Sequence, residues 1–205
     1  MNKLKQLAIV YPVLVMFVIC LVITAALAGT NSITRKKITE INEQNEKAAM
    51  QRLIEADEYE KNKVVFEDRT YEYRTAKKNG EVCGYLFKIS GKGYGGNVTV
   101  MIALNVDGSV ANIEVLDASN ETPGLGQNTA RPEFTDQFRG KSKRLEVIKS
   151  GNTPNEDQVD AVASATVTSR AVTSAVNTAI ELFGEIDYQN TADPASAAEA
   201  GEGSN

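Results

Sequence analysis

Hydrophobic and polar positions follow four different patterns along this chain of 205 residues. An uncharged apolar run near the N-terminus gives way to a polar stretch with a thin apolar stripe, typical of a solvated helix or of one that meets a partner. Alternating apolar and polar positions then indicate strands, and the chain ends in a low-complexity stretch. We therefore predict, in chain order, a transmembrane anchor over residues 1–30, a helical stalk over 31–63, a folded domain over 64–186 and a disordered acidic tail over 187–205.

The apolar run extends from Leu7 to Ala28 without a charged residue. At about 1.5 Å per residue, a helix over this run is about 33 Å long, enough to cross a hydrocarbon core of about 30 Å. A cleaved signal peptide is the alternative, because Ala26-Leu27-Ala28 resembles a cleavage site, but signal peptides have shorter apolar cores of about 7–15 residues. The length therefore favours a retained single-pass anchor. Basic residues flank it on both sides, so charge alone leaves its orientation open.

The folded domain reads as an α+β structure in which an antiparallel sheet packs with helices. Asn79-Gly80 and Asp107-Gly108 are hairpin turn signals between alternating segments, so we expect about four antiparallel strands. Residues 165–183 place apolar side chains on one broad helical face, and Gly184 follows them as the expected end of the helix.

Composition excludes several kinds of chemistry. The chain has no His and two Cys, so it has no Ser-His-Asp triad, no His-ligated haem, no Cys/His zinc site and no four-thiolate iron–sulfur cluster. Any redox chemistry therefore needs an organic cofactor. The net charge of −5 disfavours a nucleic-acid partner, which requires a basic face.

Three segments rich in glycine or hydroxyl residues carry the candidate chemistry. Each has an ordinary interpretation by itself, namely a flexible hairpin loop, a surface turn and the capped start of a helix. Each also has a functional interpretation: close approach of the backbone to a ligand, a turn whose exposed Leu125 lies against a flat ring, and a helix N-terminus that favours a phosphate. The segments are Gly91–Gly96, Asn120–Gly126 and Asp160–Ser169.

Together, the order and residue types of these segments resemble the FMN-binding domain of the G subunit of the Rnf complex, a membrane ferredoxin–NAD oxidoreductase. They also resemble the related C subunit of the sodium-pumping NADH–quinone oxidoreductase. The resemblance covers residues 85–183, and its most specific part is the string Glu-Thr-Pro-Gly-Leu-Gly at residues 121–126. The single N-terminal span and the chain length fit the Rnf protein.

The resemblance implies that FMN is held by a phosphoester to Thr166. The family's attachment motif is Asp-x-x-Ser/Thr-Gly-Ala-Thr, which aligns its first residue with Asp160 and its last with Thr166. Two positions depart from the motif, since Ala163 stands in place of Ser/Thr and Ser164 in place of Gly. The residues expected to contact the cofactor are Glu121, Thr122, Gly124, Leu125, Gly126, Ser164, Ala165 and Thr168.

The function implied is that of an electron-transfer subunit, without acid–base residues of its own, in a membrane complex that couples electron flow between ferredoxin and NAD to ion translocation. Its partners would be other membrane subunits and a flavin transferase. Its soluble domain would lie outside the cytoplasm, anchored in the inner or plasma membrane. The alternatives are a C-type subunit, a stand-alone extracytoplasmic flavoprotein, and a tethered binding module without redox function.

Overall fold

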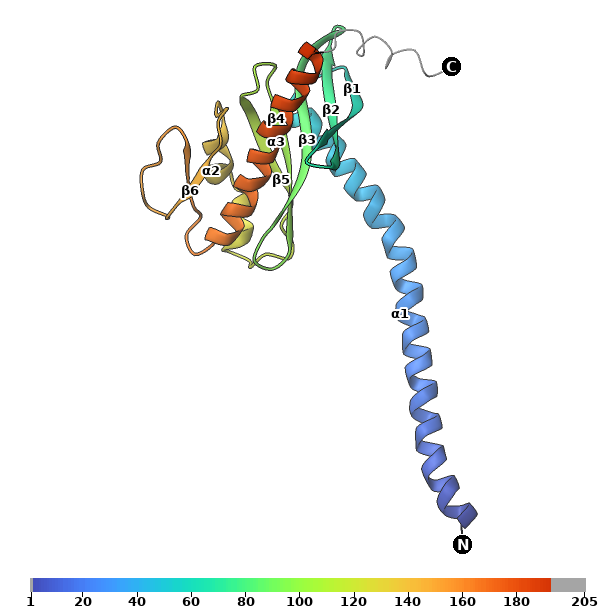
Figure 1. The fold of residues 1–205 in the computed structure, drawn as a ribbon. Coiled ribbons are helices and arrows are strands. Elements are labelled where there is room, and N and C mark those ends of the chain that lie inside the picture. The colour runs from blue at the N-terminus through green and yellow to red at the C-terminus, as the bar shows by residue number, and fades with distance from the viewer. Residues whose placement is uncertain (1, 193–205) are drawn as a thin grey trace, which may run out of the picture. The chain divides into compact units, whose positions relative to one another are not determined.

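A computed structural model describes residues 2–192, which fall into two compact units that divide between Asn45 and Glu46. Helix α1 (Asn2–Leu53) forms all of the first unit that is described (Figure 1). Its segment Tyr11–Asn31 is long and apolar enough to cross a membrane, and none of it is buried within the chain. The last turns of α1, residues 46–53, belong to the second unit.

The second unit contains a five-stranded sheet in which every neighbouring pair is antiparallel, so the predicted α+β class is confirmed. The strands follow one another in space as they do in sequence, which is the arrangement that short hairpin turns produce. They are β1 (Glu58–Phe66), β2 (Arg69–Lys78), β3 (Glu81–Lys92), β4 (Asn97–Leu104) and β5 (Val110–Asp117).

Strand β1 corrects the sequence-based boundary of the stalk. The helix ends at Leu53, and the segment predicted to continue as a helix to residue 63 pairs instead with β2. The turn between them uses Glu67 and Asp68 at φ 47° and 59°, a conformation that Asp tolerates better than most side chains. The sequence alone did not identify β1 as a strand, because charged residues are typical of an edge strand as well as of a solvated helix.

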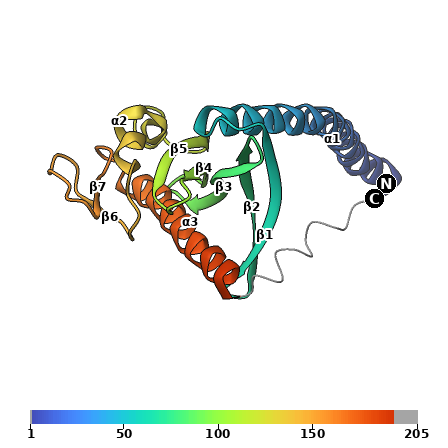
Figure 2. The same ribbon diagram turned by 90° about the horizontal axis from the view of Figure 1, so that it is seen from above.

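Alternation along the central strands gives the sheet two apolar faces. One face packs on helix α3 (Thr166–Ala192) through a core that includes Phe87, Val100 and Ile102. The other face, with Leu86 and Met101, packs on residues of the last turns of α1 such as Met50. Figure 2 shows the sheet edge-on between α3 and this end of α1.

A charged cluster adds to the attachment of residues 46–53 to the sheet. The carboxylate of Glu46 accepts hydrogen bonds from Arg74 at 2.8 Å and from Lys88 at 2.6 Å, while Arg52 pairs with Glu114 on β5. Burial by itself would raise the pKa of Glu46, but the hydrogen bonds and charges of Lys88 and Arg74 outweigh it and lower that pKa. The end of α1 is therefore part of the folded domain.

Between β5 and α3 the chain forms short elements that contact the edge strand β5 and helix α3. A parallel pair of short strands is joined to α3 by Asn177, whose side-chain amide exchanges hydrogen bonds with the backbone of Leu145 at 2.8 and 3.0 Å. The elements are η1 (Gly126–Ala130), α2 (Pro132–Thr135), η2 (Asp136–Phe138), β6 (Glu146–Ile148) and β7 (Gln158–Asp160).

Helix α3 is longer than predicted, because it continues through Gly184 to Ala192. The buried side chain of Ile186 explains the continuation, since it extends the apolar face one turn beyond Leu182 and packs in the same core. A glycine inside a helix costs about 1 kcal/mol relative to alanine, which such packing offsets. Residues 187–192 are thus helical, and the rest of the predicted tail, 193–205, lies outside the described residues.

Two glycines give a matched test of this packing. A Cβ built at Gly91 on β3 would lie far inside van der Waals contact with the backbone of Ala171 on α3, whereas one built at the exposed Gly184 meets nothing within 4 Å. We expect Gly91→Ala to lower the free energy of unfolding by about 2–3 kcal/mol and Gly184→Ala to raise it by up to about 1 kcal/mol. Urea titration of the detergent-solubilised chain measures both values, and equal effects of the two substitutions would contradict the packing described.

Candidate functional site

The register of the sheet brings the three glycine- and hydroxyl-rich segments to one end of the domain. The β3–β4 turn follows the pair Lys92 and Asn97, and the chain leaves β5 at Asp117, which is paired with Thr99. The loop after β5 therefore starts beside the β3–β4 turn. Helix α3 approaches the same end, because Gly91 has no side chain to separate β3 from the first turns of α3.

A pocket of about 500 Å³ opens where these segments meet. Eight of the residues predicted from the family resemblance line it, and they come from the loop after β5 and from the start of α3. Tyr94 of the β3–β4 turn and Val167 of α3 complete the wall. The lining residues are Tyr94, Glu121, Thr122, Leu125, Gly126, Ser164, Ala165, Thr166, Val167 and Thr168.

Glu121 joins the three segments through its carboxylate, although its residue is only 2% exposed. One carboxylate oxygen accepts a hydrogen bond from the backbone N–H of Gly95 at 2.9 Å. The other accepts a hydrogen bond from the hydroxyl of Thr168 at 2.5 Å. A side chain in the second segment thus contacts both the first segment and the third.

Glycines allow the backbone to come this close to the carboxylate. A Cβ built at Gly126 would lie 2.7 Å from the Glu121 carboxylate and 2.9 Å from the Thr168 hydroxyl. A Cβ at Gly95 would overlap the backbone of Asn120. The glycines of both loops are therefore required by close packing around Glu121, in addition to any contact with a ligand.

The Glu121 carboxyl is held in its charged form. Burial by itself would raise its pKa, but hydrogen bonds from Thr168 and from the backbone of Gly95, Gly96 and Tyr94 outweigh burial and lower the pKa below the usual value for glutamate. The pocket therefore has an anion in its wall at neutral pH.

Thr166 is the first residue of α3, and its half-buried side chain lines the pocket. Among the described residues, its hydroxyl has no hydrogen-bond partner, in contrast to those of Thr168 and Ser169, which are bonded to Glu121 and to the backbone of Ala165. The first intrahelical bond joins the N–H of Ser169 to Ala165, so the preceding N–H groups have no partner within the helix. A free hydroxyl and the positive end of a helix thus share one wall.

Ser164 adopts φ 59°, in the left-handed region where side chains are strained. This conformation gives a physical reason for the glycine that the attachment motif normally has at this position, since glycine adopts it without steric cost. The side chain of Ser164 is exposed and lines the pocket.

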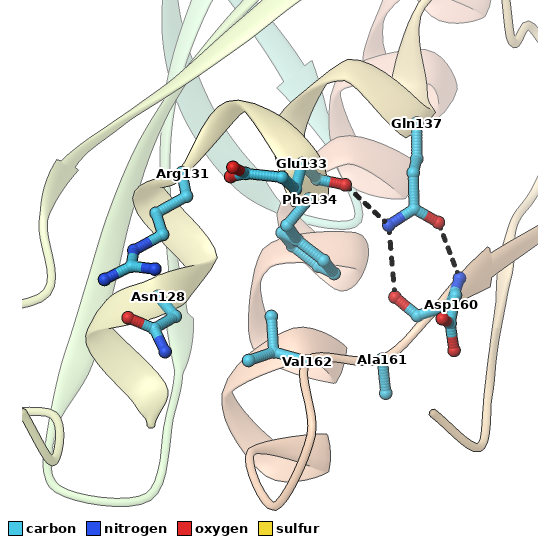
Figure 3. Close-up of a pocket in the computed structure, with 8 residues that line it drawn as sticks. All are labelled: Asn128, Arg131, Glu133, Phe134, Gln137, Asp160, Ala161 and Val162. Carbon is cyan, nitrogen blue, oxygen red and sulfur yellow. Dashed lines mark hydrogen bonds between the residues drawn. The ribbon is translucent and has the colours of Figure 1, made fainter. Parts of the chain in front are cut away.

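Two predicted site residues do not line this pocket. Gly124 forms a turn at φ 76°, and its carbonyl accepts a hydrogen bond from the side chain of Asn128. Asp160 instead lines a neighbouring pocket of about 360 Å³, where Figure 3 shows its backbone N–H and carbonyl joined to the side-chain amide of Gln137. The Asp160 carboxylate accepts hydrogen bonds from the N–H of Gly151 and so supports the loop before the motif.

Sequence reasoning missed Tyr94 and Val167 as pocket residues. Tyr94 lies in the first glycine-rich segment, and Val167 stands between two predicted contacts, but neither was among the residues expected to contact the cofactor. Tyr94, Leu125 and Val167 are 78%, 40% and 49% exposed, so apolar surface faces solvent around the pocket. The arrangement suits a flat, partly apolar ligand that also carries a phosphate.

Comparison with known proteins finds a matching family model and several relatives. Residues 93–181 match the family model of the FMN-binding domain. The chain is 36% identical over 186 residues to the G subunit of the Na(+)-translocating ferredoxin:NAD(+) oxidoreductase complex of Acetobacterium woodii, covering 83% of this chain and 89% of that protein. It is 35% identical over 111 residues to the G subunit of the proton-translocating complex of Clostridium ljungdahlii, covering 54% of this chain and 58% of that protein.

Similarity to a C subunit covers a smaller part of the chain. The C subunit of the Na(+)-translocating NADH-quinone reductase of Vibrio alginolyticus is 31% identical over 104 residues, which is 47% of this chain and 41% of that protein. The match to the protein of Acetobacterium woodii is therefore the longer of the two.

Substitution of Ser164 tests the strained start of α3. We expect Ser164→Gly to raise the free energy of unfolding by about 0.5–1 kcal/mol, because relief of left-handed strain exceeds the added entropy of the unfolded glycine. Ser164→Ala keeps the strain and should give no such gain. Both values come from urea titration, and a loss of stability in Ser164→Gly would show that the serine side chain supports this turn.

Proposed function

We propose an electron-transfer role for this chain, which belongs to the family of G subunits of ion-translocating ferredoxin:NAD(+) oxidoreductase complexes. In this proposal the chain carries FMN in the pocket between the loop after β5 and the start of α3. The observation that supports it most directly is the meeting of the Glu121–Gly126 string with the free hydroxyl of Thr166 in one pocket wall.

The described residues fit FMN. The pocket volume lies within the range of small-molecule sites, and its exposed apolar side chains, Leu125 and Tyr94, suit the faces of a ring system. The N–H groups without a helical partner at the start of α3 suit a phosphate. When bound, FMN supplies one- and two-electron transfer, while the residues of the chain bind it, orient it and exclude water from part of its surface.

Covalent attachment at Thr166 is part of the proposal. The Thr166 oxygen would form a bond to the phosphorus of the flavin nucleotide while the bond from phosphorus to the activating group of the flavin donor breaks. That group would leave with the bonding electrons, and the hydroxyl proton would pass to a base of the enzyme that catalyses the transfer. A flavin transferase would supply that donor. The hydroxyl is suited to this reaction because it lines the pocket and its oxygen accepts and donates no hydrogen bond among the described residues.

The proposal includes a membrane anchor over residues 1–30, formed by the apolar part of α1. It also includes a soluble domain that lies outside the cytoplasm. The partners would be other members of a redox complex that couples electron flow between ferredoxin and NAD to ion movement. The coupling ion is left open, because one related G subunit is named for sodium and another for protons. A G-type role is preferred to a C-type role because similarity to a G-type relative extends over 83% of the chain.

Loss of the acceptor hydroxyl tests covalent attachment. When the chain is produced with a flavin transferase, we expect an intact mass increased by one FMN phosphoester and in-gel flavin fluorescence. Thr166→Ala should abolish both signals, whereas Ser164→Ala, which removes the neighbouring hydroxyl that also lines the pocket, should retain them. An adduct that persists in Thr166→Ala would place the attachment elsewhere, and a wild-type chain without an adduct would favour a binding module without redox function.

Cysteine labelling in intact cells tests the membrane orientation. The chain has two native thiols, Cys20 in the apolar segment and the half-buried Cys83, so the double substitution Cys20→Ser, Cys83→Ser provides a background without them. In that background, Val106→Cys, at a position 58% exposed on the β4–β5 turn, should react with a membrane-impermeant maleimide. Asn2→Cys, before the apolar segment, should react only after permeabilisation. The reverse pattern would place the folded domain in the cytoplasm.

A further inference from the structure

Glu121 is the only charged residue among the described residues that line the proposed FMN pocket. The other lining side chains are neutral, and no Lys or Arg is among them. The neighbouring pocket differs, because Arg131, Glu133 and Asp160 line it together. The anion in the wall of the FMN pocket therefore has no cationic side chain in the same described wall to neutralise it.

The contacts of Glu121 keep this charge in place. One carboxylate oxygen accepts a hydrogen bond from the Gly95 N–H at 2.9 Å, and the other accepts one from the Thr168 hydroxyl at 2.5 Å. Such donors stabilise the ionised carboxylate over the neutral acid. They also hold the side chain in one position, because the Thr168 hydroxyl belongs to α3 and the Gly95 N–H to the β3–β4 turn.

We propose that Glu121 does more than join the three segments: its negative charge holds the reduction potential of the bound flavin low. Reduction adds electrons to the ring, and proton uptake neutralises only some of the added negative charge. A fixed anion in the pocket wall repels the charge that remains, which makes reduction less favourable. A partly buried site screens the charge less than water does. This inference rests on the proposed function, because it concerns the flavin that the pocket is proposed to hold.

The positive end of α3 acts in the opposite direction, since unpaired N–H groups at a helix start favour negative charge. That contribution comes from the backbone and is the same with or without a charge at Glu121. A substitution that removes only the charge of the side chain therefore isolates the effect of the carboxylate.

Glu121→Gln is the substitution of choice because glutamine has nearly the same shape. Its carbonyl oxygen can accept from Gly95 N–H, and its amide can donate to Thr168, whose hydroxyl turns from donor to acceptor. Glu133→Gln is the matched control, because it removes one negative charge from the wall of the neighbouring pocket instead. Thermal unfolding of the flavin-free chains, measured first, checks that both variants fold as the wild type does.

The midpoint potential of the flavinylated, detergent-solubilised full chain is then measured by spectroelectrochemical titration. We expect Glu121→Gln to raise the potential by at least the equivalent of a tenfold change in the ratio of reduced to oxidised protein, about 30 mV for two electrons. Glu133→Gln should change this ratio by less than about threefold, because its charge lies in the other pocket. An unchanged or lowered potential in a folded, flavinylated Glu121→Gln chain would overturn the inference and leave the proposed function intact.

A second variant covers the case in which Glu121→Gln does not fold. Thr122→Lys places a cation at an exposed position of the same wall without changing any atom of the Glu121 contacts, and it should also raise the potential. If it does not, charge in this wall does not control the flavin and the inference fails. A wild-type chain that takes up no flavin would instead count against the proposed function, so the two failures are distinguishable.

Discussion

The site depends on the buried carboxylate of Glu121, which accepts hydrogen bonds from the β3–β4 turn and from helix α3 at once. A buried carboxylate is stable only when donors replace the water it loses, and here backbone and hydroxyl donors do so. Because those donors come from distant parts of the chain, satisfying one side chain fixes the positions of three segments. The pocket is the space left between the segments that Glu121 holds together.

Glycine makes this arrangement possible by shortening the distances between backbones. Gly126 leaves room for the carboxylate and for Thr168, and Gly91 lets α3 come close to β3, so the first residue of the helix reaches the pocket. The short turn between β3 and β4 and the last residue of β5 lie at the same end of the sheet, because neighbouring strands pair antiparallel. Sheet geometry thus brings the two glycine-containing loops together, and the close packing of α3 on β3 brings the hydroxyl of Thr166 to them.

Some elements followed from local patterns and others did not. The apolar N-terminal run, the turns at Asn79-Gly80 and Asp107-Gly108 and the amphipathic helix α3 all carry signals within a few residues. Strand β1 does not, because its charged residues fit a solvated helix equally well until β2 is seen to pair with it. The continuation of α3 through Gly184 also depends on contacts with residues distant in the sequence, because Ile186 is buried in the core.

The sequence by itself determined the absence of histidine chemistry, the apolar N-terminal run, the α+β class and, through its resemblance to a known family, most of the residues around the pocket. Only the tertiary structure decided how those residues are used. The Glu121 carboxylate accepts a hydrogen bond from Thr168, and Asp160 lines a different pocket. Tyr94 is part of the pocket wall, and Ser164 has a strained left-handed backbone conformation. The reason is physical: a motif fixes the residue types, but hydrogen-bond partners and burial depend on segments that meet only after the sheet and α3 have packed.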